Sequence, residues 1–220
     1  MIKVTYIDHM GSDLSVVNAA RVSFGKSSEM DRSDQWGPPK LKDKDAKLIK
    51  YLAKHKHTSP FNHTFMTVHV KAPIFVARQL QKHEYMPWNE ISRRYSTEKI
   101  FFYEPDHWRD KSKDKKQGSG GKSQSQYFPN IYVKEVSEKA LGDYKKMLTQ
   151  GIAPEQARMI LPQNTMTEWY WSGTLGAWAK MCNLRCKEDT QLETRRVGNE
   201  VSNIMLRYFP VSWEALKHDY

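Results

Sequence analysis

The chain has 220 residues, of which 39% are hydrophobic, including seven Trp and eleven Tyr, so we predict one globular domain over residues 1–220. No run of about 18 apolar residues occurs, which argues against a membrane-spanning helix. The first residues are too polar for a signal peptide, so we expect a cytoplasmic, reducing location, in the host cytoplasm if the genome is viral.

The formal net charge of +10 favours anionic partners, such as nucleotides, a dinucleotide cofactor, a polyglutamylated cofactor or nucleic acid. Much of the excess charge lies in residues 108–126, which are rich in Lys, Gly, Ser and Gln and contain no aliphatic residue. Because such a segment buries little apolar surface, we expect a mobile surface loop. Basic and aromatic residues do not interleave there, so a nucleic-acid tail is the less favoured interpretation.

The sequence has two cysteines, Cys182 and Cys186, which are four residues apart. No other ligands at a suitable spacing lie nearby. We therefore expect two reduced thiols and no metal site.

Strand and helix signals alternate irregularly in the first half of the chain. The β-branched alternation of residues 2–8 predicts a strand, and a turn at 10–13 precedes a helix over 14–22. The polar residues 25–43 predict a loop. Next come an expected helix at 45–55, a strand at 64–70, and a helix at 74–83 with Pro73 as its first helical position.

The second half begins with a short apolar stretch at 100–103 that predicts a strand. The clearest amphipathic helix covers 134–150 and ends at Gly151. The expected elements after it are a helix at 154–161, a strand at 163–172, a helix at 174–184 and a helix at 189–208 that stops before Pro210.

This order of elements predicts a mixed α+β domain. It has no alternating βαβ units and no Gly-rich phosphate loop. The absence of a G-x-G-x-x-G sequence means that any dinucleotide would be held outside a Rossmann fold.

The densest group of polar residues lies between Arg78 and Tyr95. On the expected helix, Gln79 and His83 share one face because they are four residues apart, and Arg78 and Lys82 share another. Cations beside an amide suit a phosphate or a uracil-like ring, since both bind several convergent donors. The alternative is a solvated helix face.

The polar loop that follows this helix favours a ligand site. It carries charges and donors without a helical or strand period, namely Asn89, Glu90, Ser92, Arg93 and Arg94. Loops of this kind often carry function on a rigid scaffold.

Three other segments are candidates that also fit ordinary structural roles. Residues 57–63 (HTSPFNH) fit a simple turn, and Arg158 within 157–162 (ARMILP) fits a surface helix end. Arg185 within 183–185 (NLR), followed by Gln191 and Glu193, is the third candidate.

Together these segments resemble the flavin-dependent thymidylate synthases. The signature of that family is an Arg-His-Arg triplet, then seven residues, then Ser; here Lys82-His83-Glu84 is followed by seven residues and Ser92. The elements at 19–24 (AARVSF), 57–63, 157–162 and 183–185 are also similar to family elements and occur in the same order. The resemblance runs from about Met10 to Trp213, apart from the loop near 108–126.

The resemblance implies a central antiparallel sheet with packed helices and the synthesis of dTMP from dUMP. It implies FAD as the cofactor, NADPH as the reductant and 5,10-methylenetetrahydrofolate as the carbon donor, with no protein cysteine as nucleophile. It also implies a homotetramer whose sites are shared between subunits, without a specific nucleic-acid partner.

The resemblance assigns roles to individual residues. Arg185 and Ser92 are the expected catalytic residues, and a fixed Arg185 cation beside the uracil ring would favour ionisation at N3. The expected dUMP ligands are Gln79, Lys82, Glu90, Ser92, Arg93, Arg94, Arg158 and Arg185, with Arg94 and Arg158 on the phosphate. The expected FAD ligands are His57, Ser59, Lys82, His83, Glu84, Glu90, Thr174 and Lys180.

The departures from the family pattern gather in the flavin half of the site. Lys82 keeps the charge of the first Arg but loses its bidentate fork, and Glu84 reverses the charge of the second. Pro87, Thr174 and Lys180 also replace family residues. These changes leave open a relative with altered cofactor use that transfers another C5 group, such as hydroxymethyl. A basic nucleic-acid-binding protein is a third hypothesis, and it predicts steeply salt-dependent binding.

Overall fold

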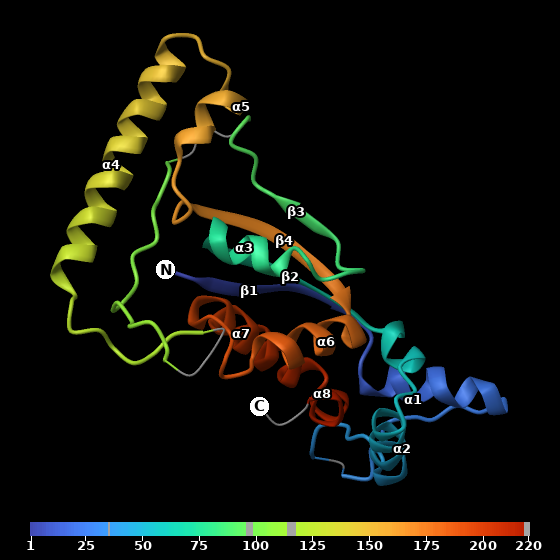
Figure 1. Cartoon of the computed structure of the whole chain (residues 1–220). Helices are drawn as coiled ribbons and strands as arrows, with labels where there is room; N and C mark the ends of the chain where they lie inside the picture. Colours follow the sequence, from blue (N-terminus) through green and yellow to red (C-terminus); the bar gives the residue numbers. More distant parts are fainter. Residues whose placement is uncertain (35, 96–98, 114–117, 218–220) are drawn as a thin grey trace.

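The computed structural model describes residues 1–34, 36–95, 99–113 and 118–217. At its centre is a four-stranded sheet in the order β1-β2-β4-β3, and all three strand pairs are antiparallel. The strands are β1 (Lys3–Met10), β2 (Phe65–Pro73), β3 (Trp88–Glu90) and β4 (Met166–Thr174). The predicted α+β class with a central antiparallel sheet is confirmed (Figure 1).

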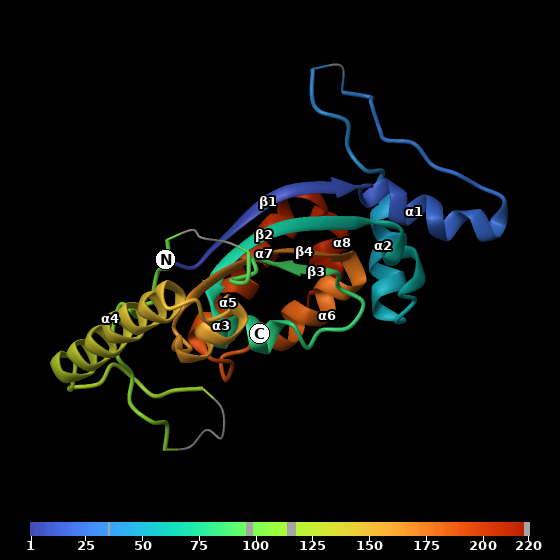
Figure 2. The ribbon, with the colours of Figure 1, turned by 90° about the horizontal axis from the view of Figure 1, so that it is seen from above.

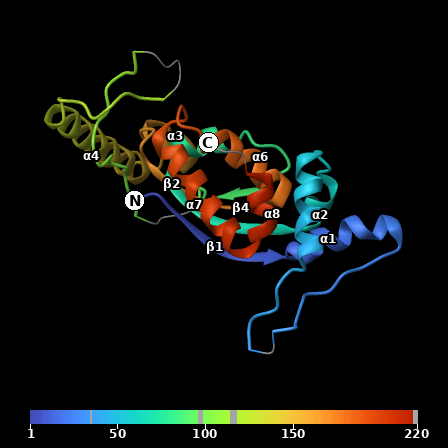
Figure 3. The same cartoon turned by 90° about the horizontal axis from the view of Figure 1, so that it is seen from below.

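One face of the sheet forms the core. Alternate residues of β2 and β4 are buried because successive side chains point to opposite faces, as with Val68, Val70, Trp169 and Trp171. This face packs against α6 (Leu175–Arg185), α7 (Leu192–Tyr208) and α8 (Pro210–Leu216), which Figure 3 shows in front of the strands. The other face carries partly exposed polar residues, including His69, Glu168 and Tyr170.

Helices also stand at the two ends of the sheet. At one end lie α1 (Asp13–Arg21) and α2 (Asp43–Lys54), and residues 25–34 and 36–42 extend from them as a long arm (Figure 2). At the other end α4 (Tyr127–Thr149) packs on α5 (Pro154–Ala157) through a small cluster of buried Ile100, Tyr144 and Ala157. The shorter elements are α3 (Ile74–Leu80) and the 3-10 turns η1 (Val22–Phe24), η2 (Ser59–His63) and η3 (Arg158–Ile160).

Two strand predictions were wrong. Residues 88–90, expected to lie in a polar loop, form edge strand β3, and Trp88 stacks on Trp169 of β4 with ring centroids 4.3 Å apart. Residues 100–103, expected to be a strand, make a single bridge through Phe102 to Thr165. In both places the pairing partner is distant in sequence, so the local pattern carries no signal for it.

Several helix boundaries also differ from those expected. Pro73 is the last residue of β2 rather than the first of a helix, and α3 ends at Leu80 rather than at His83. Helix α4 begins at Tyr127 rather than at residue 134. Pro210 does follow α7 as expected, but it then starts the unpredicted helix α8, because Pro is well suited to a first helical position.

The Lys-rich segment 108–126 is partly described, since residues 114–117 lie outside the described residues. Its described ends run antiparallel, with a bridge between Arg109 and Lys122. The expected mobility of the segment stays a prediction.

Cys182 and Cys186 form no disulfide, as expected of reduced thiols, and both are buried. Of the helices in the described ranges, none combines the length and apolar character needed to cross a bilayer.

Candidate active site

The end of α6 brings the candidate catalytic arginine against the last turn of α3 and the residues that follow it. Arg185, the last residue of α6, donates from Nε to His83 Nε2 over 3.0 Å and from a terminal nitrogen to the Gln79 carbonyl oxygen over 2.8 Å. Two fixed acceptors therefore orient the guanidinium. Burial lowers the pKa of Arg185 from its usual high value, and the group stays charged at neutral pH.

His83 is held neutral. Burial, then the charge of Arg185, then that of Lys180, lower its pKa from 6.5 to about 4. A neutral imidazole has one acceptor nitrogen, and here that acceptor is Nε2, which receives the Arg185 hydrogen bond. The ring thus serves as a hydrogen-bond acceptor at neutral pH and not as a second cation.

The side chain of Gln79 is fixed by residues at the start of α7. Its Nε2 donates to Gln191 Oε1 over 2.5 Å, and its Oε1 accepts from Thr194 Oγ1 over 3.1 Å. The structure therefore brings Gln79, His83 and Arg185 together, and joins them to Gln191 and to Thr194, a residue that the sequence analysis did not single out.

The loop after β3 holds the next group of predicted residues. Ser92 Oγ accepts from the backbone nitrogen and from Nε of Arg94, over 3.3 and 3.4 Å. Arg93 donates to the Met166 carbonyl over 3.4 Å. Glu90 is tied to the sheet, because its Oε1 accepts from Thr167 Oγ1 over 2.6 Å.

A cavity of about 480 Å³ lies between this loop and α4. Arg93, Arg94, Lys99 and Lys145 contribute four cations to its lining, and Tyr95 contributes an aromatic ring. Four cations, with no acidic residue among the described lining residues, suit a phosphate group.

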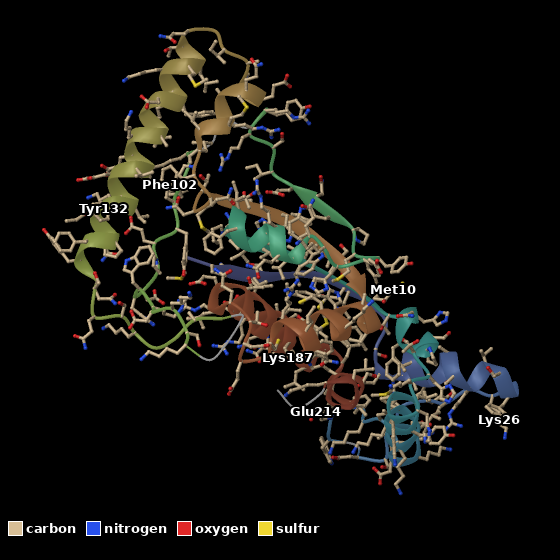
Figure 4. The ribbon with its side chains drawn as sticks, in the orientation of Figure 1. Met10, Lys26, Phe102, Tyr132, Lys187 and Glu214 are labelled. Carbon is tan, nitrogen blue, oxygen red and sulfur yellow. The ribbon has the colours of Figure 1, made fainter. Side chains whose placement is uncertain are left out.

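A larger groove of about 1540 Å³ lies between α2, α6 and α8. Three predicted flavin ligands, Glu84, Thr174 and Lys180, are among its lining residues. Lys187 and Glu214, both labelled in Figure 4, line it from the chain after α6 and from α8. Thr174 also caps α6, accepting from the Ala177 nitrogen over 3.2 Å.

The remaining predicted residues are not gathered into one place. His57 and Ser59 flank Thr58, which lines the groove, but neither lines it in this chain. Lys82 is exposed on the turn after α3. Arg158 is exposed in η3, where its Nε contacts the Glu155 carbonyl at 3.4 Å, and it lines neither cavity.

Comparison with known proteins identifies the family. The family described as thymidylate synthase complementing protein matches residues 5–211. The flavin-dependent thymidylate synthase of Thermus thermophilus is 39% identical, over 97% of this chain and 75% of the relative. That of Thermosipho africanus is 36% identical, over 97% and 90%. This chain belongs to the flavin-dependent thymidylate synthase family.

Structural similarity agrees with this membership. The UMP/dUMP methylase PolB from Streptomyces cacaoi bound with 5-Br dUMP has a TM-score of 0.84 and 31% identity, over 98% of this chain and 94% of that one. The same methylase bound with 5-Br UMP also gives a TM-score of 0.84, at 30% identity. The resemblance inferred from the motifs is therefore confirmed at the level of the family and its fold.

Sequence reasoning missed several residues that line the groove of this family member. Lys50 and Lys54 of α2 both face it, and Lys56 and Lys187 add to the same lining. The spacing of four residues between Lys50 and Lys54 places them on one helix face and was an available signal. No local pattern indicated that this face would lie opposite α6 and α8.

Proposed function

We propose that this chain methylates dUMP to dTMP with a bound flavin, taking the carbon from 5,10-methylenetetrahydrofolate and the electrons from NADPH. The observation that carries the proposal is the half-buried Arg185, held by His83 and the Gln79 carbonyl. A fixed cation next to a uracil ring stabilises the imide anion and so lowers the pKa of N3.

The groove fits a flavin nucleotide. Its volume of about 1540 Å³ exceeds the roughly 300–1,000 Å³ of ordinary small-ligand sites, which suits an extended cofactor. Its lining combines five lysines with two glutamates, so a surplus of positive charge faces a pyrophosphate; these residues are Lys50, Lys54, Lys56, Lys180, Lys187, Glu84 and Glu214. Phe61, Leu184 and Val211 add apolar surface for a ring system.

When bound, the flavin supplies the reducing equivalents that convert the transferred one-carbon unit to a methyl group. The chain's own residues bind and orient. Thr174 and Lys180 lie on the flavin groove, whereas Glu84 places a negative charge there. His57, Ser59, Lys82, His83 and Glu90 are the other proposed flavin ligands.

We assign the nucleotide to residues of α3, α6 and the loop after β3. Gln79 and Arg185 face the base, and Arg94 and Arg158 bind the phosphate, with Lys82, Glu90, Ser92 and Arg93 nearby. In one chain, Arg94 and Lys180 line different cavities. This separation supports a homotetramer in which each site takes its phosphate and flavin ligands from different subunits.

The test begins with flavin and nucleotide binding. Purified protein is mixed with FAD and dUMP and desalted, and its absorbance spectrum is expected to show retained oxidised flavin. Lys180→Ala is expected to lose flavin, whereas Lys47→Ala, an exposed lysine of α2 that does not line the groove, is the matched control.

The second stage identifies the product by mass spectrometry after adding methylenetetrahydrofolate and NADPH. A methyl group on the uracil ring supports the proposal. A hydroxymethyl group, or bound dUMP without retained flavin, would instead favour a relative with different C5 chemistry.

A further inference from the structure

The hairpin at the base of the Lys-rich segment is attached to the start of α7 by a buried ion pair. A terminal nitrogen of Arg109 lies 2.9 Å from both carboxylate oxygens of Glu193, and Arg109 Nε donates to Ser119 Oγ over 2.6 Å. The side chains of Arg109 and Glu193 are only 17% and 4% exposed, so the pair is shielded from solvent. Removing one partner would leave the other charge buried and unpaired.

The backbone of the hairpin also contacts the chain just before α7. Gly118 has a φ of +84°, and a Cβ there would lie 2.9 Å from the Asp189 carbonyl oxygen. Within the hairpin, Asp110 donates its backbone N–H to the Gly121 carbonyl over 3.0 Å. The described ends of the segment are thus fixed against the connection between α6 and α7.

A chain of hydrogen bonds leads from Glu193 to Gln79, the residue proposed to face the base. Gln191 Nε2 donates to Glu193 Oε2 over 3.1 Å, and Gln191 Oε1 accepts from Gln79 Nε2 over 2.5 Å. A carboxylate only accepts hydrogen bonds, so it requires the NH₂ end of Gln191 to face it. That leaves the oxygen of Gln191 for Gln79, and so favours the orientation of the Gln79 amide in which its Oε1 accepts from Thr194 Oγ1.

The orientation of an amide matters to a pyrimidine. The uracil edge presents an N3–H donor beside the O4 acceptor, whereas the cytosine edge presents an N3 acceptor beside an amino donor. An amide turned by 180° exchanges its own donor and acceptor, so it would pair with the other base. A group that fixes the Gln79 amide therefore bears on the choice of base.

We propose that Glu193 is a positioning residue for the pyrimidine site. It orients Gln79 through Gln191 and is itself held by Arg109, so residues 108–113 and 118–123 help to set the preference for uracil over cytosine. This inference rests on the proposed function, because it needs dUMP to bind at Gln79.

The test compares the affinities for dUMP and dCMP by calorimetry in four proteins. They are the wild type, Glu193→Gln, Arg109→Gln and the matched control Asp106→Asn. Asp106 pairs with Arg196, which lies on α7 like Glu193, over 2.6 Å. The Asp106 side chain is 68% exposed, and this pair does not reach Gln79. Thermal unfolding checks that each variant is folded, and Arg109→Gln keeps the test informative if Glu193→Gln does not fold.

Glu193→Gln is isosteric but can present either end of its amide to Gln191, so both orientations of Gln79 become accessible. We expect the preference for dUMP over dCMP to fall by about tenfold, equivalent to about 1.4 kcal/mol, with Arg109→Gln showing a smaller fall and Asp106→Asn none.

An unchanged preference in Glu193→Gln would overturn the inference. So would equal weakening of both nucleotides, since that would show a purely structural role. If the wild type fails to bind dUMP at all, the proposed function itself fails, and this result is distinct from either of the other two.

Discussion

At the scale of single residues, the pairing of Arg185 with His83 is the most informative feature. A histidine between two cations would ordinarily cost stability, but here the imidazole stays neutral and accepts a hydrogen bond from one of them. The lowered pKa of His83 thus preserves Arg185 as the positive charge that faces the proposed uracil site. Because His83 is neutral in this arrangement, the stability of the folded state depends on pH.

We expect His83 to make the folded state less stable as the pH falls from 6.5 toward 4. Its pKa is about 4 in the folded protein and 6.5 when unfolded, so over that range the unfolded state binds the extra proton. His83→Gln lacks this titration. Urea unfolding at several pH values measures the free energy of unfolding of both proteins. The difference between wild type and His83→Gln should shrink as the pH falls, and a difference that stays constant from pH 7.5 to 4.5 would contradict the assignment.

Arg94 carries the proposed phosphate contact and can be tested separately. Arg94→Ala removes a charge-assisted contact worth about 1.5–3 kcal/mol, so the Kd for dUMP should rise roughly 10- to 150-fold with the fold retained. Arg207→Ala, an exposed arginine of α7 that lines neither cavity, is the control. Calorimetric titration measures the dUMP affinity of both variants. An Arg94→Ala affinity equal to that of the wild type would remove Arg94 from the phosphate site.

At the scale of elements, the site depends on close packing between α6 and α7. Gly198 of α7 faces the end of α6, and a Cβ there would lie 3.0 Å from Cys186 Sγ and 3.6 Å from the Cβ of Arg185. The backbone of α7 can therefore approach the base of Arg185 closely. This approach also lets Gln191 and Thr194 reach Gln79.

Two glycine substitutions should have opposite effects on stability. Gly198→Ala adds a methyl group to a filled space and should destabilise the fold by about 1–3 kcal/mol. Gly142 lies on α4, and a new Cβ there would have nothing within 4 Å, so Gly142→Ala should stabilise the fold by about 0.5–1 kcal/mol. Denaturant unfolding measures both, and a stabilising Gly198→Ala would show that the two helices are not tightly packed there.

At the scale of the whole molecule, five of the predicted ligands line two separate cavities. The 480 Å³ cavity beside α4 holds Arg93 and Arg94, while the 1540 Å³ groove holds Glu84, Thr174 and Lys180. One face of the sheet also keeps partly exposed His69, Glu168 and Tyr170. Both features are compatible with the proposed assembly of subunits.

Mixed oligomers test whether sites are shared. Arg94→Ala and Lys180→Ala should each be inactive alone. When the two are unfolded and refolded together, random mixing should give roughly a quarter of the wild-type activity, because some sites then combine an intact Arg94 from one subunit with an intact Lys180 from another. No recovery, in a mixture shown by light scattering to be oligomeric, would place each site within a single chain.

Local patterns in the sequence were sufficient to predict the class of fold and the family. Alternating β-branched residues indicated β1 and β2, an amphipathic period indicated α4, and ordered motifs from residues 19–24 to 183–185 indicated the family, because these signals are local. The resemblance also pointed to Gln79 and Arg185 as nucleotide ligands and to His83 as a flavin ligand.

The contacts between these residues, in contrast, could be read only from the folded chain. Strand β3 depends on pairing with β4, and the orientation of Gln79 depends on Gln191, Thr194 and, through Gln191, on Glu193, which are more than 100 residues away. The neutral state of His83 depends on burial and on the charges of Arg185 and Lys180. Each of these effects arises from proximity in space between segments distant in the chain, and a local sequence pattern cannot encode that proximity.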